Sequence, residues 1–260
     1  IWKALPLNPS LCLALPIDPT EAKSGFNSFS PEIKNKLFGI FDEVESSTAI
    51  CWYPNSKFYT PLFIVKTGGL ENKIEEISYI FNELIGNLEA KVETNRYFKP
   101  FPVERKKLVA GQIWTRNVSS PFGLLSKPTD DTNKMRFKKY LKVTLAYYKE
   151  YLIFSPDYEL VRNSIEILEK RYPPISDSLK NGNLNKLLIL NPKELSGLLN
   201  QSILEGLPSN KDAVFREALS NNFFPMVNKF GDFANVGLEM PIISKVETGR
   251  WQRLKWENLN

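Results

Sequence analysis

The sequence predicts an α+β fold, a mostly antiparallel sheet built from hairpins with amphipathic helices packed on it. The composition is that of a folded globular protein, with 42% hydrophobic and 24% charged residues in a chain of 260, which is long enough to bury a large core. Runs with β character come in pairs around short turns. Helical stripes follow these pairs, and the dominance of hairpins favours α+β over a doubly wound parallel sheet.

The N-terminal region predicts a strand and then a helix. Residues 11–15 form an apolar run between prolines, and prolines cannot join a β-ladder, so we expect one short buried strand. Ser30 followed by Pro31 is typical of a helix start, with serine as the N-cap and proline at the first helical position. A helical stripe then follows at Ile33, Leu37 and Ile40.

The clearest hairpin lies between residues 49 and 65. Two runs rich in aromatic and β-branched residues, 49–53 and 58–65, flank a turn at 54–57. The pair Gly68-Gly69 ends the hairpin, and an apolar stripe over residues 74–88 predicts a strong amphipathic helix.

A second unit repeats this order of elements. Residues 141–147 and 151–154 predict two strands, and Ser155-Pro156-Asp157 predicts the start of a helix with an acidic first turn. The two units share almost no sequence identity. Either a structural repeat or coincidence explains the similar order.

The rest of the chain predicts further elements and one boundary. We expect further strands within residues 107–114, a surface loop over 119–133, and a strand at 187–190. Helices are expected near 193–204 and 210–221, and the alternation from 231 onward is typical of strands. The break Tyr172-Pro173-Pro174 predicts an N-terminal α+β unit, 1–172, and a C-terminal one, 173–260. These units form either two domains or one continuous domain.

The absence of histidine excludes several function classes. Ser-His-Asp and Cys-His catalysis, HExxH zinc sites and histidine pH switches all require that residue, and the chain has none. The net charge of +5 is a mild excess, and the densest basic stretches, 105–107 and 134–142, are short. Each is interpreted as a solvated face, with a polyanion or membrane-surface patch as the alternative. We expect no nucleic-acid partner and no transmembrane segment.

The two cysteines leave two interpretations open. Cys12 and Cys51 each lie in the middle of an expected strand. They are either buried reduced thiols that act as small hydrophobic residues or a disulfide between neighbouring strands, formed in an oxidising compartment. A metal site or thiol catalysis is not expected, because no histidine stands near either cysteine.

Known catalytic and cofactor motifs are missing. Asp130-Asp131 lacks the spacing of a calcium loop, and Gly68-Gly69 matches neither GxGxxG nor GxxxxGK[ST]. The nucleophile motifs GxSxG and SxxK are also absent. We therefore predict no catalytic residue, no cofactor and no metal ligand.

Aromatic side chains indicate a binding surface instead. Because alternate residues of a strand face opposite sides, about half of the strand aromatics should face outward, where tyrosine, tryptophan and arginine bind partners well. Core packing explains the same residues. The candidate surface consists of Trp52, Tyr53, Tyr59, Tyr148, Trp251, Arg253 and Trp256.

Three stretches resemble a bacterial family of unknown function, the YfaA-like envelope proteins. The stretches are Leu11-Cys12-Leu13-Ala14-Leu15-Pro16-Ile17-Asp18, Trp52-Tyr53 with Thr60-Pro61-Leu62-Phe63-Ile64-Val65, and Tyr151-Leu152-Ile153-Phe154-Ser155-Pro156-Asp157. The resemblance implies a periplasmic or envelope setting, a longer parent protein, and an association with bacterial alpha-2-macroglobulin-like protease inhibitors. It implies no assigned activity.

These observations give three functional hypotheses. The first is a non-enzymatic binding or accessory protein of the bacterial cell envelope, whose partner is another protein such as an alpha-2-macroglobulin-like one. The second is a carboxylate-dependent hydrolase that acts on carbohydrate or peptide. The third is a polyanion-binding module. The first places the chain in the periplasm or envelope, with the cytoplasm as the alternative.

Overall fold

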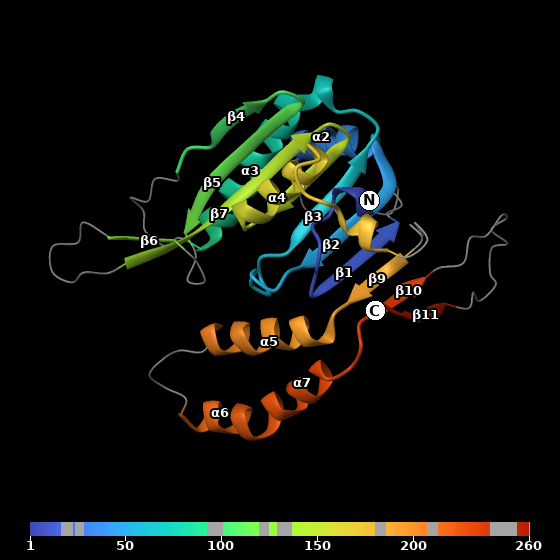
Figure 1. The fold of residues 1–260 in the computed structure, drawn as a ribbon. Coiled ribbons are helices and arrows are strands. Elements are labelled where there is room, and N and C mark those ends of the chain that lie inside the picture. The colour runs from blue at the N-terminus through green and yellow to red at the C-terminus, as the bar shows by residue number, and fades with distance from the viewer. Residues whose placement is uncertain are drawn as a thin grey trace. The chain divides into compact units, whose positions relative to one another are not determined.

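The chain forms two compact units (Figure 1). A computed structural model describes residues 1–16, 23, 29–92, 101–119, 125–128, 137–179, 186–206, 213–239 and 254–259. Unit 1 consists of residues 1–15, 49–61 and 166–260, and unit 2 consists of residues 16–48 and 62–165. Each unit combines antiparallel strands with helices, so the α+β prediction is confirmed. The division into domains 1–172 and 173–260 stays a prediction.

Unit 2 contains an antiparallel sheet with β4 at one edge. The strands stand in the spatial order β3 (Leu62–Thr67), β8 (Tyr151–Ser155), β7 (Phe137–Tyr148), β5 (Gly111–Ser119) and β4 (Glu104–Leu108). A further strand, β6 (Leu125–Pro128), pairs with β7 and lies inside the stretch for which a loop was predicted. Residues 44–48 of β2 (Val44–Trp52) also belong to this unit.

The helices of unit 2 are α2 (Pro31–Phe41), α3 (Ile74–Val92), which follows the 3-10 turn η2 (Glu71–Lys73), and α4 (Tyr158–Leu168). Side chains cap the starts of α2 and α4. Ser30 Oγ accepts a hydrogen bond from the Ile33 amide at 3.5 Å, as the sequence predicted. At α4 the capping oxygen comes from Asp157, whose carboxylate accepts from the Glu159 amide at 3.0 Å.

The core of unit 2 lies between α2, α3 and one face of the sheet. The fully or almost fully buried side chains of this cluster are Ile33, Leu37, Ile40, Leu70, Ile77, Ile80, Phe81, Ile85, Trp114, Val143 and Tyr147. Alternate residues of a strand face opposite sides, so Lys142 lies on the other face. Its ammonium lies 4.5 Å from the centre of the Tyr158 ring at the start of α4. The start of helix α4 therefore lies on that second face.

The expected strand region 107–114 is divided by a tight turn at Val109-Ala110. Gly111 begins β5 where two backbones approach closely, because a Cβ at this position would lie 2.0 Å from the Tyr147 carbonyl oxygen. The Lys149 amide donates a 2.8 Å hydrogen bond to the Ala110 carbonyl and holds the turn. Val109 is fully exposed. This turn lacks the usual Asn-Gly or Asp-Gly pair.

Unit 1 contains a smaller antiparallel sheet. Its strands stand in the order β11 (Lys255–Asn258), β10 (Val236–Glu239), β9 (Lys186–Leu190) and β1 (Leu11–Pro16), followed by residues 49–52 of β2. Two 3-10 turns, η1 (Trp2–Ala4) and η3 (Ile175–Ser178), also belong to unit 1 and contact each other. The Ile175 amide donates to the Leu5 carbonyl at 2.9 Å.

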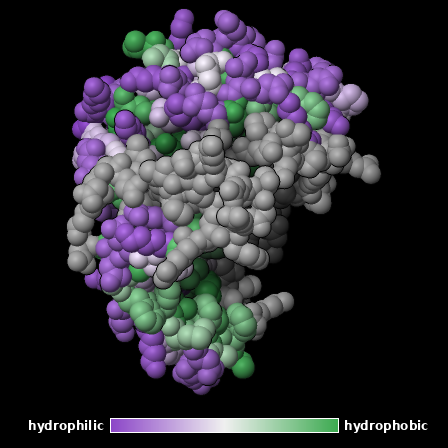
Figure 2. All heavy atoms as spheres, turned by 90° about the vertical axis from the view of Figure 1, so that its right-hand side faces the viewer, coloured by the Kyte–Doolittle hydropathy of each residue, from purple (hydrophilic) through white to green (hydrophobic). Residues whose placement is uncertain are grey.

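The helices of unit 1 form a hairpin that is thinly packed. They are α5 (Pro192–Gly206), α6 (Ala213–Ala218), the π-helical turn η5 (Leu219–Phe223) and α7 (Phe224–Gly231). The helix predicted at 193–204 is confirmed, and the one predicted at 210–221 begins at Ala213. Of residues 214–231 only Val227 is buried. Hydrophobic residues gather at the lower end of the face in Figure 2, where these helices lie.

None of the helices in the described part of the chain combines the length and the apolar character that crossing a membrane requires.

Candidate functional site

The two cysteines form a disulfide within unit 1. Cys12 lies in β1 and Cys51 in β2, which are neighbours in the sheet, and their Cα atoms are 4.1 Å apart. Both side chains are fully buried. Of the two interpretations that the sequence left open, the structure therefore contains the disulfide.

The predicted aromatic surface is only partly exposed. Tyr53, just after β2, and Tyr148, at the end of β7, are both buried, which is a correction to the expectation that they face outward. The Tyr53 hydroxyl donates to the Pro6 carbonyl at 3.2 Å. Half-buried Trp52 donates from Nε1 to the Phe58 carbonyl at 2.7 Å and stacks on the Phe58 ring.

The other members of that surface differ in exposure. Tyr59 is half-buried, and Trp256 in β11 is 64% exposed. Trp251 and Arg253 lie outside the described residues. The exposed aromatic surface that the described residues support is therefore smaller than predicted, with Trp256 as its most exposed member.

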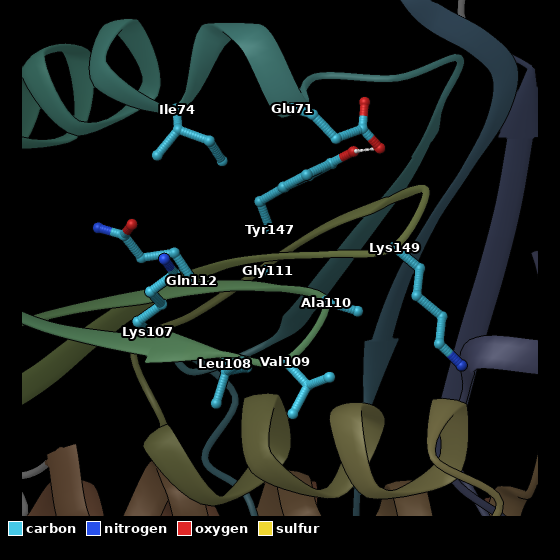
Figure 3. Close-up of a pocket in the computed structure, with 10 residues that line it drawn as sticks. All are labelled: Glu71, Ile74, Lys107, Leu108, Val109, Ala110, Gly111, Gln112, Tyr147 and Lys149. Carbon is cyan, nitrogen blue, oxygen red and sulfur yellow. Dashed lines mark hydrogen bonds between the residues drawn. The ribbon is translucent and has the colours of Figure 1, made fainter.

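Unit 2 contains a pocket of about 490 Å³ (Figure 3). Three segments surround it: the start of η2 and α3, the β4–β5 turn, and the β7–β8 turn. The lining residues are Glu71, Ile74, Lys107, Leu108, Val109, Ala110, Gly111, Gln112, Tyr147 and Lys149. A cavity of this size is within the range that small ligands and peptide side chains occupy.

Tyr147 and Glu71 form the polar centre of the pocket. The Tyr147 hydroxyl donates to Glu71 Oε1 at 2.8 Å and accepts from the Leu70 amide at 3.1 Å. Tyr147 is 1% exposed, whereas Glu71 reaches solvent. Glu71 also stands at the N-terminal end of a helical segment, where a negative charge is favoured by the aligned backbone dipoles.

The local environment moves the pKa values of this pair apart. Burial, with a contribution from the Glu71 carboxylate, raises the pKa of Tyr147 to about 12. Hydrogen bonds from its own backbone amide and from Tyr147 lower the pKa of Glu71. Near neutral pH the phenol therefore keeps its proton and the carboxylate stays ionised. Efficient general acid–base groups titrate near the working pH, and neither group of this pair titrates near neutral pH.

Glycines place both partners of the pair. Gly69 has φ +135°, a conformation that favours glycine, and the Gly68 amide donates to the Glu43 carbonyl at 2.6 Å. The Gly68-Gly69 turn, which the sequence predicts only as the end of a hairpin, therefore positions Glu71. Close packing at Gly111 brings the β4–β5 turn against the backbone of Tyr147.

The rim of the pocket carries polar and cationic side chains. Lys107 and Gln112 are cross-strand partners on β4 and β5, and they lie on the far side of Tyr147 from Glu71 in Figure 3. Lys149 extends away from the Tyr147 hydroxyl, and its ammonium lies 5.5 Å from the centre of the Tyr148 ring. In the part of the chain that the structure describes, no cluster of three or more His, Cys, Asp or Glu side chains could hold a metal ion.

No local pattern in the sequence indicates that Glu71 and Tyr147 form a pair. They are 76 positions apart, and each has a plausible local role, as a helix-start acid and as a strand aromatic. The pair Gly68-Gly69 before an acidic helix start indicates that Glu71 has a defined position. It does not indicate that Tyr147 is the partner of Glu71.

Comparison with known proteins identifies the family of the chain but assigns it no activity. A family model described as "Uncharacterized protein conserved in bacteria (DUF2138)" matches residues 1–256. The chain is 27% identical over all of its 260 residues to "Uncharacterized protein YfaA" of Escherichia coli strain K12, and it covers 45% of that protein. The chain thus spans less than half the length of this relative. No solved structure matches. The resemblance to a YfaA-like bacterial family is confirmed.

Proposed function

We propose, for a chain that belongs to the DUF2138 family of bacterial proteins, a role as a non-enzymatic binding or accessory protein of the cell envelope. The observation that carries this proposal is the buried Cys12–Cys51 disulfide. Structural disulfides persist in oxidising compartments such as the periplasm and are rare in the bacterial cytoplasm. The disulfide therefore supports a location outside the cytoplasm.

The chemistry of the pocket supports binding over catalysis. Glu71 is held as a carboxylate and Tyr147 as a neutral phenol, so neither is prepared to exchange a proton near neutral pH. Together with Lys107 and Gln112 they offer hydrogen-bond donors and acceptors of both charges beside the apolar Ile74. Such a lining suits a segment of another protein. The alpha-2-macroglobulin-like partner that the family resemblance implies belongs to this proposal.

Cell fractionation tests the location. The protein is expressed from its own full-length gene in its bacterial host, and the periplasmic contents are released by osmotic shock. We expect the protein to leave with them, or to be digested when protease is added to intact spheroplasts. Protection until the inner membrane is broken contradicts the proposal.

A substrate panel tests the hydrolase alternative. Purified protein is assayed against glycoside, ester and peptide substrates beside the variant Glu71→Gln, which removes the pocket's carboxylate while keeping its shape. We expect no turnover by either protein. Turnover that is lost in the variant would replace the binding role with an enzymatic one.

A further inference from the structure

We propose that the edge strand β4 binds an acidic, extended segment of a partner protein, which adds to the sheet of unit 2 as one more strand. This inference rests on the proposed binding function and names the class of partner. In strand addition, main-chain hydrogen bonds supply affinity, and pockets on the two sides of the edge strand supply specificity.

Strand β4 lies at the edge of its sheet. It is the last strand in the order β3-β8-β7-β5-β4, and among the described residues it pairs only with β5. Its residues Glu104 to Lys107 are all exposed. A strand with a single neighbour directs alternate N–H and C=O groups outward, where another extended chain can pair with them.

Each face of β4 borders a pocket. Arg105 points toward α3, where its guanidinium lies 3.5 Å from the Glu75 carboxylate, and Lys107, two positions further, shares that face and lines the 490 Å³ pocket. Glu104 points to the opposite face and accepts a hydrogen bond from Thr115 Oγ1 at 3.4 Å.

On that opposite face lies a smaller pocket of about 180 Å³. Lys106 lines it together with Glu104, and on β7 so does Lys142, whose ammonium lies over the Tyr158 ring. The side chains of an added strand alternate between the two faces. Successive side chains of the bound segment would therefore lie next to the two pockets in turn.

The positive charge of β4 favours an acidic occupant. Arg105, Lys106 and Lys107 give β4 three consecutive cations and one acid, Glu104. Within the described residues, neither Lys106 nor Lys107 forms an ion pair, so both are available to carboxylates of a ligand. A second copy of β4 would place like charges opposite each other, which destabilises strand pairing. An acidic segment places opposite charges next to each other, which stabilises strand pairing.

A labelled peptide tests this proposal. The probe has about nine residues, longer than β4, and repeats Glu-Glu-Val, so that glutamates face both sides of the added strand. A matched peptide repeats Lys-Lys-Val, and a single-stranded oligothymidylate represents polyanions in general. Binding is measured by fluorescence anisotropy on the whole chain with its disulfide intact. Hydrogen exchange then reports on the amides of residues 104–108.

We expect the acidic peptide to bind and to slow exchange in β4, and we expect the lysine peptide not to bind. The double variant Lys106→Glu with Lys107→Glu should weaken binding at least about tenfold, because two attractions become repulsions. The control, Lys193→Glu with Lys229→Glu, changes net charge equally on exposed helix positions of unit 1 and should bind like the parent. Circular dichroism confirms that both variants are folded.

Three results overturn the proposal. One is no binding of the acidic peptide up to about 1 mM. Another is binding that leaves exchange in 104–108 unchanged or is matched by the oligonucleotide, which indicates a general polyanion surface. The third is equal binding by the charge-reversed variant. In each case the fractionation result still decides the envelope role separately, and a cytoplasmic location with peptide binding would remove only that role.

Discussion

Helix α3 of unit 2 and the helical stretch α6–η5–α7 of unit 1 have similar lengths and apolar contents but very different surroundings. Helix α3 buries Ile77, Ile80, Phe81 and Ile85 against α2 and the sheet. In the other stretch only Val227 is buried over residues 214–231, while Phe215 and Met226 are at least half exposed. An apolar stripe thus predicts a helix, but burial depends on whether the fold supplies a second layer.

Removing a large side chain from each helix tests this comparison most strongly. Phe81→Ala in α3 should lower the free energy of unfolding by about 3 to 5 kcal/mol, since a buried ring leaves a cavity. Met226→Ala in α7 should change it by less than about 0.5 kcal/mol, because the side chain is mostly in water. Urea denaturation measures both. Equal losses for the two variants would contradict the burial difference.

The disulfide should matter for unit 1, whose helices are thinly packed. Replacing both Cys12 and Cys51 by alanine opens a loop of 39 residues, and the chain-entropy model predicts a loss of about 4 kcal/mol. Hydrogen exchange should rise first in β1 and β9, which pair in the same sheet. If exchange instead rose first in α3, the comparison between the units would be wrong.

The burial of Tyr147 in unit 2 can be tested by measuring folding stability at alkaline pH. Its pKa is about 12 in the folded protein and near 10.0 when exposed, so above pH 10 the unfolded chain loses the proton first. Folding stability therefore falls as pH rises from about 10 to 12, by about 2 kcal/mol, and is unaffected by this group below pH 10. In a plot of the free energy of unfolding against pH from about 10 to 12, the decline should be smaller for Tyr147→Phe than for the parent protein. An equal decline in the two proteins would contradict the raised pKa of Tyr147.

The smallest expected effect concerns the contact between α5 and α7. The Asn200 side-chain amide donates to the Asn228 side-chain oxygen at 2.8 Å. Asn228→Ala should lower the free energy of unfolding by about 1 kcal/mol or less, as for a single exposed hydrogen bond. Thermal unfolding measures it, with Asn221→Ala on the same helical stretch as a solvent-facing control. A loss near that of Phe81→Ala would show that this hairpin is packed more tightly than its burial indicates.

Local signals predicted much of the fold, whereas the candidate site depends on long-range contacts. Ser30-Pro31 located the start of α2, and the apolar run before Pro16 located β1. The β4–β5 turn lacks the common turn residues, and its need for Gly111 comes from the backbone of Tyr147, far away in the chain. The same holds for Tyr147 and Glu71, since no local pattern indicates which strand aromatic reaches which helix start.

The redox state of Cys12 and Cys51 in the bacterium tests the central claim most directly. Cells are lysed in the presence of an alkylating agent, without reductant, and free thiols are counted by mass on the denatured protein. A protein exported to the envelope with its disulfide formed has no alkylated cysteine, which is the result we expect. Two alkylated cysteines would contradict both the disulfide in the native protein and the envelope role that depends on it.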